Sequence, residues 1–122
     1  MSARAATVAV MTDAAAVAEA HAIFDPLAAE YLVRPDVDIG PMFGSEGLRV
    51  RGKVFAFVGH RGAMVVKLPA ARVDELDGID GLERMVMRER AMREWMLAPA
   101  AAGERWEPLL AEAFAYVDEI TP

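Results

Sequence analysis

The sequence of 122 residues contains no cysteine and only two histidines. Without cysteine, a disulfide scaffold, a thiolate nucleophile, an iron–sulfur cluster and a cysteine-based zinc site are all excluded. His21 and His60 are too few for a three-histidine metal site, and neither stands at a motif spacing from an acid or a nucleophile. The few serines and threonines lie outside any G-x-S-x-G context. The sequence therefore predicts no catalytic residue, no metal ion and no cofactor.

Long apolar runs are also absent. No run reaches the roughly 18 residues that a membrane-spanning helix needs, and 24 of the 67 hydrophobic residues are alanine. The first residues lack a secretory pattern, because Arg4 is the only base there and Asp13 interrupts the apolar stretch. These absences predict a cytoplasmic protein with no membrane partner. The length predicts a single domain over residues 1–122.

A helical pattern begins at Asp13. The apolar residues that recur at steps of three and four, and so share one helix face, are Val17, Ala20, Phe24, Leu27 and Tyr31. Pro26 allows two interpretations, one kinked helix or two helices that meet near Asp25. Arg34-Pro35 closes this segment, since the residue before a proline avoids the helical region. Residues 1–11 show no matching pattern, and we interpret them as a flexible tail.

The middle of the chain predicts an antiparallel sheet. Short apolar runs rich in β-branched and aromatic residues cover residues 48–50, 54–58 and 63–68. Arg51-Gly52 separates the first two runs, and the glycine-flanked residues 59–62 separate the second from the third. Such spacing is typical of a meander of strands joined by tight turns.

The second of these strands has two apolar faces. Strict alternation places Phe55 and Phe57 on one face, and the residues expected on the other are Val54, Ala56 and Val58. A strand with two apolar faces is expected to be central and covered on each side.

The last third of the chain predicts two helices and one ambiguous segment. Pro69 ends the sheet and begins a short helix through Leu76, with Val73 and Leu76 facing inward and Gly78 at its end. Residues 82–97 fit both helical and strand periodicity. The sequence therefore does not decide whether residues 84–91 form a helix or a strand. A final helix is expected over about residues 104–120. Its predicted buried stripe consists of Trp106, Leu110, Ala113, Val117 and Ile120.

Several short motifs occur together along the chain. They are residues 42–45 (MFGS), 47–48 (GL), 52–58 (GKVFAFV), 65–69 (VVKLP), 72–76 (RVDEL), 92–95 (MREW), and Trp106 to Val117 in the tail. In this combination the chain resembles the N-terminal domain of TfoX (Sxy)-type proteins and the related MmcQ/YjbR-like group. The resemblance covers roughly residues 23 to 118.

The resemblance implies an α+β fold. It is an antiparallel sheet of about four to six strands, packed with N-terminal and C-terminal helices and a short helix after the central strands. It also implies that Met92–Leu97 is a strand. The family-motif residues with an implied structural role are Met42, Phe43, Gly44, Gly47, Gly52 and Trp95. Relatives usually carry glycines shortly before the M-[KR]-E-W motif, where this chain has Met87 and Glu89. A turn there lacks the positive φ that glycine adopts easily.

The founding members of that family are regulators of natural competence with a second, helical, nucleic-acid-associated domain. These 122 residues contain no such second domain, so we do not expect the competence function to transfer as a whole. Many single-domain relatives have no assigned activity.

The charge distribution is uneven. The net charge is −6, yet the segment from Leu48 to Val73 carries six bases and no acid. The six candidate binding residues for an anion or a nucleic acid are Arg49, Arg51, Lys53, Arg61, Lys67 and Arg72. If they converge, they form a patch for phosphate or another anion. Alternatively, they pair with carboxylates from the helices or protect an edge strand from aggregation.

Three functions follow from these observations. The leading hypothesis is a non-catalytic domain that acts in regulation by binding a protein partner or itself, and methionines such as Met85 and Met87 make a homodimer plausible. The second is a nucleic-acid-associated regulator that uses the basic segment 48–73. The acidic net charge does not favour binding to nucleic acid. The third is a small-molecule or anion-binding module, or an enzyme without a recognisable catalytic constellation, for which Lys53 and Lys67 are the first residues to mutate.

Overall fold

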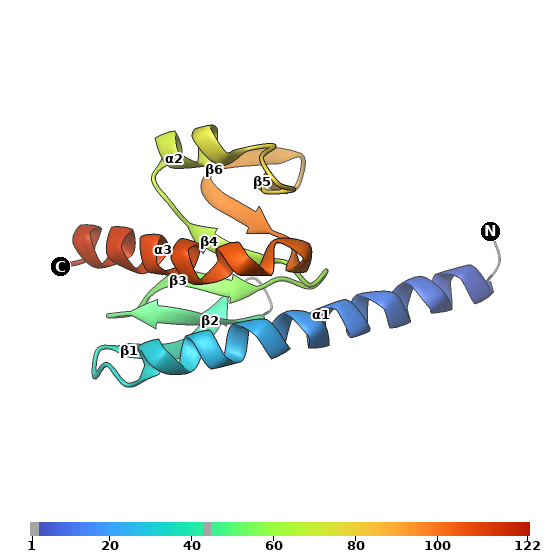
Figure 1. Cartoon of the computed structure of the whole chain (residues 1–122), viewed down its shortest axis with the longest axis horizontal. Coiled ribbons are helices and arrows are strands. Elements are labelled where there is room, and N and C mark those ends of the chain that lie inside the picture. Colours follow the sequence, from blue (N-terminus) through green and yellow to red (C-terminus); the bar gives the residue numbers. More distant parts are fainter. Residues whose placement is uncertain (1–2, 43–44) are drawn as a thin grey trace.

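The computed structural model describes residues 3–42 and 45–122, with side chains from residue 14 onward (Figure 1). Within these ranges the chain has three α-helices and a six-stranded antiparallel sheet of order β1-β2-β3-β4-β6-β5. The elements are α1 (Ala3–Leu32), β1 (Val37–Met42), β2 (Ser45–Val50), β3 (Lys53–Val58), β4 (Met64–Lys67), α2 (Ala70–Leu76), β5 (Glu83–Met87), β6 (Arg90–Ala98), the 3-10 helix η1 (Ala100–Arg105) and α3 (Trp106–Ile120). The predicted α+β fold, with its terminal helices and the short helix after the central strands, is confirmed.

Helix α1 continues through Pro26 as one helix. Ala20, Phe24 and Ala28 are buried one turn apart, whereas Pro26 is exposed. The carbonyl of Ala22 loses its helical hydrogen bond to Pro26, and Ala22 is also exposed, so that water can satisfy this group. The proline is tolerated because it lies on the solvent side of the helix.

The interpretation of residues 1–11 as a flexible tail is wrong for residues 3–11, which belong to α1. This stretch is rich in alanine and contains no glycine or proline, so its helix propensity is high. Figure 1 shows the N-terminal part of α1 extending beyond the sheet. A helical segment that projects in this way needs no amphipathic pattern, and the tail interpretation relied on the lack of one.

Two-residue turns join β2 to β3 and β5 to β6. Val50 pairs with Lys53 across Arg51-Gly52, whose φ angles are 46° and 85°. The second turn, Arg88-Glu89, has φ angles of 52° and 65°. Positive φ at both central residues is the geometry of type I′ turns, which match the twist of the flanking strands. The turn predicted at Arg51-Gly52 is confirmed, and the β5–β6 hairpin makes the same kind of turn without glycine.

The ambiguous segment 82–97 forms most of this β5–β6 hairpin. Met92–Leu97 lies within β6, as the family resemblance implied. Strand β6 pairs with β4 as well as with β5, with Leu97 opposite Val65 and Met96 opposite Val66. Pairing with β4 decides the structure here, because helix propensity is a weaker effect than a buried strand register.

A β-bulge in β3 overturns the predicted alternation. Leu48 of β2 pairs with Ala56, and the next residue, Arg49, pairs with Val54, so that Phe55 has no partner on β2. The extra residue shifts the phase of the strand by one position. Phe55 and Ala56 therefore both face the helices, whereas Phe57 faces the opposite side. Phe55 and Phe57 do not share a face, as strict alternation required.

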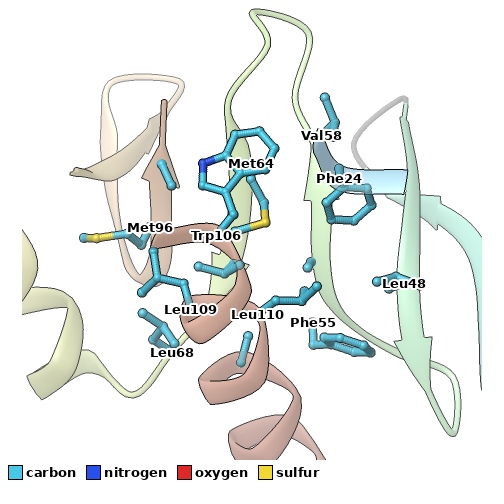
Figure 2. Close-up of a cluster of buried hydrophobic side chains, with 14 of the residues drawn as sticks. Phe24, Leu48, Phe55, Val58, Met64, Leu68, Met96, Trp106, Leu109 and Leu110 are labelled. Carbon is cyan, nitrogen blue, oxygen red and sulfur yellow. The ribbon is translucent and has the colours of Figure 1, made fainter. Parts of the chain in front are cut away.

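The three α-helices pack on one face of the sheet, which we call the helix face. Figure 1 shows α1 and α3 lying across it, and α2 adds Val73 and Leu76 to the same core, as predicted. Figure 2 shows Trp106, Leu109 and Leu110 of α3 among side chains of β3, β4 and β6. The opposite face, which we call the outer face, carries an apolar cluster that contains no residue from a described helix. Strand β3 is central but is not covered by helices on both sides.

The C-terminal helix confirms most of its predicted stripe. The buried residues of α3 are Trp106, Leu109, Leu110, Ala113 and Val117. Ile120 does not belong to the stripe, since 52% of its surface is exposed. It lies in the last turn of α3, where the helix passes the end of the sheet (Figure 1).

Gly62 is expected to tolerate alanine much less well than Gly52. Both glycines have φ near 85°, but a Cβ on Gly62 would lie 2.6 Å from the backbone of Ala16 in α1, whereas a Cβ on Gly52 meets nothing within 4 Å. We expect Gly52→Ala to lower the free energy of unfolding by about 1 kcal/mol and Gly62→Ala by about 2–4 kcal/mol. Urea denaturation measures both, and equal losses would contradict the close approach of α1 to the β3–β4 turn.

In the β5–β6 turn, which lacks glycine, we expect a substitution to glycine to stabilise the fold. Glu89 has φ of 65°, a strained value for a residue with a side chain. We expect Glu89→Gly to raise the free energy of unfolding by about 0.5–1 kcal/mol. Arg90→Gly, one residue later in β6, is the matched control and is expected to lower it by about the same amount. A loss of stability in Glu89→Gly, measured by urea denaturation, would contradict the type I′ turn.

Candidate functional site

Arg49 of the basic segment is engaged in an ion pair on the outer face. Its guanidinium donates to both carboxylate oxygens of Asp38 at 2.8 and 2.6 Å, and it lies over Gly40 of β1. The hydrogen bonds from Arg49 lower the pKa of Asp38 below its ordinary value. Because the folded pKa is the lower one, this pair stabilises the fold above about pH 4 and loses its effect as acid protonates Asp38.

Arg51 connects the β2–β3 turn to the end of α3. Its guanidinium contacts the carboxylates of Asp36 at 2.7 Å and Asp118 at 2.9 Å. It also donates to the backbone carbonyls of Asp118, Thr121 and Pro122 at 2.8 to 3.1 Å. These hydrogen bonds raise the pKa of Arg51 further above its already high value. Arg51 is therefore a structural clamp and has little capacity left for an external anion.

Arg72 is engaged in the same way. It donates to both oxygens of Glu112 at 2.8 and 3.1 Å and lies 3.8 Å from Glu75, which ties α2 to α3. Arg49, Arg51 and Arg72 thus follow the alternative in which bases of this segment pair with carboxylates. The six bases do not form one patch, because these three are held at separate places in the fold.

The other three bases differ in position. Arg61 is exposed in the β3–β4 turn and forms no ion pair with any described residue. Lys53 begins β3 and Lys67 ends β4, and these two strands are neighbours in the sheet. The structure therefore brings Lys53 and Lys67 to the same end of the sheet, and Arg61 to the other end of the same two strands.

The outer face carries a second apolar cluster, which we call the outer-face cluster. Its buried members are Phe57, Val65 and Trp95, and the rings of Phe57 and Trp95 meet edge to face at 5.9 Å. Partly buried residues pack around them: Met42, Val54, Met85, Met92 and Leu97. All eight residues come from strands. Methionine fits irregular and changing contacts well, so this rim is an adaptable apolar surface.

Most of the described family-motif residues lie in the outer-face cluster or next to it. Met42 and Trp95 belong to the outer-face cluster. Gly47 lies beneath it, since a Cβ there would come within 2.8 Å of the Val54 side chain. Gly52 completes the β2–β3 turn. Phe43 and Gly44, with the roles in the core and in a turn that the sequence predicted for them, lie outside the described residues.

A cleft of about 490 Å³ adjoins this cluster, and we call it the lysine cleft. Lys53, Val54 and Lys67 contribute from β3 and β4, and Trp95 contributes from β6. The C-terminal end of α3 closes another side, chiefly through Ile120 and Thr121. The sequence singled out both lysines, but it did not connect them with Trp95 or with the end of α3. A hint was present, because alternation across paired strands places Lys67 and Trp95 opposite each other.

The two histidines lie near a larger cleft of about 650 Å³ between α1 and the strands β1, β2 and β3. His21 pairs with Asp25 one turn along the same helix at 2.9 Å, and both side chains are largely exposed. His60 has no hydrogen-bond partner within the described ranges. A surface histidine–aspartate pair without a bonded nucleophile does not make an acid–base–nucleophile set.

The described part of the chain holds neither a cluster of metal-ligating side chains nor a membrane-spanning helix. No group of three or more potential metal-ligating side chains comes together there. None of its helices combines the length and the apolar character needed to span a bilayer.

Comparison with known proteins finds no matching family model, no matching curated protein and no matching solved structure. The resemblance to the TfoX N-terminal domain therefore stays a prediction that rests on the motifs quoted above. The geometry of the outer-face cluster and the lysine cleft stands independently of that resemblance.

The clamp formed by Arg51 is expected to depend on the shape of its side chain as well as on its charge. Arg51→Lys keeps the charge but cannot reach two carboxylates and three carbonyls at once, since an ammonium group lacks the planar fork. We expect a clearly lower midpoint of urea unfolding for Arg51→Lys. The matched control is Arg61→Lys, in an exposed turn, with an unchanged midpoint. Equal midpoints for the two variants would show that the Arg51 contacts do not hold the end of α3.

Proposed function

We propose that this chain is a non-catalytic domain of TfoX N-terminal type that acts in regulation by protein–protein association, with a second copy of itself as the first partner to test. The outer-face cluster is the observation that carries this proposal. A cytoplasmic location, expected from the sequence, belongs to the same proposal.

The physical support is the one-sided layering of the sheet. Sheet faces that are apolar are usually covered by a second layer. Here the helix face is covered by α1, α2 and α3, while Phe57, Val65 and Trp95 on the outer face are shielded by neighbouring strand side chains. A partner that covers the partly exposed methionines Met42, Met85 and Met92 would remove more apolar surface from water, which favours association.

The nucleic-acid alternative has less support. Phosphate recognition needs several free bases that converge. Arg49, Arg51 and Arg72 are held by carboxylates of the chain itself. The free Arg61 lies at the opposite end of β3 and β4 from Lys53 and Lys67.

Self-association is tested by light scattering across a range of protein concentrations. We expect the wild-type chain to form a dimer or a larger oligomer at about 100 μM. The double variant Met85→Gln/Met92→Gln is expected to weaken association at least about tenfold, because polar amides replace the apolar rim. The matched control is Val33→Gln. Val33 is 82% exposed and lies outside the outer-face cluster, so this change is expected to have no effect.

Two results would contradict this proposal. A wild-type chain that stays monomeric at about 100 μM rules out self-association as the mode of action. An oligomer that is weakened equally by Val33→Gln and by the methionine variant forms through another surface. Circular dichroism of each variant checks that the fold is retained.

A further inference from the structure

The lysine cleft has the size and position of a small-molecule site. Its volume of about 490 Å³ falls within the range of roughly 300–1,000 Å³ that ligand pockets occupy. It lies where β3 begins and β4 ends, beside the last turn of α3. Both layers of the fold therefore contribute to it: the sheet through the ends of β3 and β4 and through Trp95 of β6, and the helix layer through Ile120 at the end of α3.

The charge of the cleft is opposite to that of the chain. The net charge of the sequence is −6, yet the side chains that line the cleft include Lys53 and Lys67 and no aspartate or glutamate. Lys53 forms no ion pair with any residue in the described ranges. The oxygen of Pro122, at the rim, is engaged by Arg51. The cleft is thus a local cationic site in an acidic protein, which concentrates anions.

Lys67 is only loosely held by the protein. The one described carboxylate within ion-pair range is Glu94, at 3.8 Å. Glu94 does not line the cleft, and its other oxygen accepts a 2.5 Å hydrogen bond from the Tyr116 hydroxyl. The Lys67 ammonium also lies 5.6 Å from the centre of the Trp95 ring. This cation–π contact positions the charge beside the indole and leaves it able to bind an anion.

The remaining walls are mostly apolar, with Thr121 as the polar side chain among them. Trp95, Val54 and Met42 belong to the outer-face cluster, and Ile120 exposes 52% of its surface beside them. Ile120 is the last residue of α3, beyond the buried residues of that helix, and its exposed side chain lines this cleft. A ligand that satisfies both features must combine an anionic head with an apolar body.

We propose that the lysine cleft binds a small organic monocarboxylate with an apolar body. The carboxylate contacts the ammonium groups of Lys53 and Lys67, and the body packs against Trp95 and Ile120. This site does not depend on the association proposed above, and it is tested separately.

The experiment titrates the full chain with octanoate and follows the indole N–H signals of Trp95 and Trp106 by NMR. Trp106 is fully buried in the main core and serves as an internal reference. We expect saturable binding within about 10 mM octanoate, with the Trp95 signal shifting more than the Trp106 signal. Octanol lacks the charge and inorganic phosphate lacks the apolar body, so each is expected to bind at least about tenfold more weakly.

Variants test whether octanoate binds in the lysine cleft or adheres nonspecifically to the protein surface. Lys53→Gln and Lys67→Gln are each expected to weaken octanoate binding about tenfold, and Lys67→Arg is expected to restore most of it. Arg61→Gln removes the same charge at the other end of β3 and β4 and is expected to leave binding unchanged. The proposal is overturned if octanol binds as tightly as octanoate, if Arg61→Gln weakens binding as much as the lysine variants, or if no binding is detected. A larger shift at Trp106 than at Trp95 would also place the ligand elsewhere.

Discussion

One extra residue in β3 organises both faces of the sheet. Because Phe55 has no partner on β2, it turns to the helix face together with Ala56, and its ring meets Tyr31 of α1 and Phe114 of α3 at 5.8 and 5.4 Å. The same shift sends Phe57 to the outer face, where it meets Trp95. A β-bulge thus joins the two long helices to the sheet and also creates the apolar cluster on the opposite side.

Charge pairing then decides which bases are available for binding. Arg49, Arg51 and Arg72 each reach a carboxylate from another element, so their positive charges are used to hold β1, α3 and α2 in place. Lys53 and Lys67 lie where no acidic side chain lines the wall. Arginine, with its planar fork, suits the structural pairs, whereas the ammonium groups of the two lysines line an open cleft. A net charge of −6 therefore coexists with a small cationic site.

Local signals predicted the elements of the fold better than their faces. The spacing of Val17 to Tyr31 predicted the packed side of α1, and the glycines around His60 predicted the β3–β4 turn. The sequence did not decide between a helix and a hairpin at Arg88-Glu89. Both turn residues have positive φ without being glycine, and such residues cannot be recognised from composition. The faces of β3 were wrong, since a bulge depends on the register of the partner strand, and no pattern within β3 records that register.

For the candidate sites, too, the sequence predicted the residue types and the tertiary structure decided their arrangement. The sequence by itself determined the α+β class, the absence of thiol chemistry, and the six bases among which any anion-binding residues were to be found. Only the tertiary structure decided which of those bases are paired, and it brought Lys53 and Lys67 together with Trp95 and Ile120 from distant parts of the chain. The physical reason is that side-chain charge and size are local properties of a sequence. Convergence depends on strand register and helix docking, which are set by contacts between residues far apart in the chain.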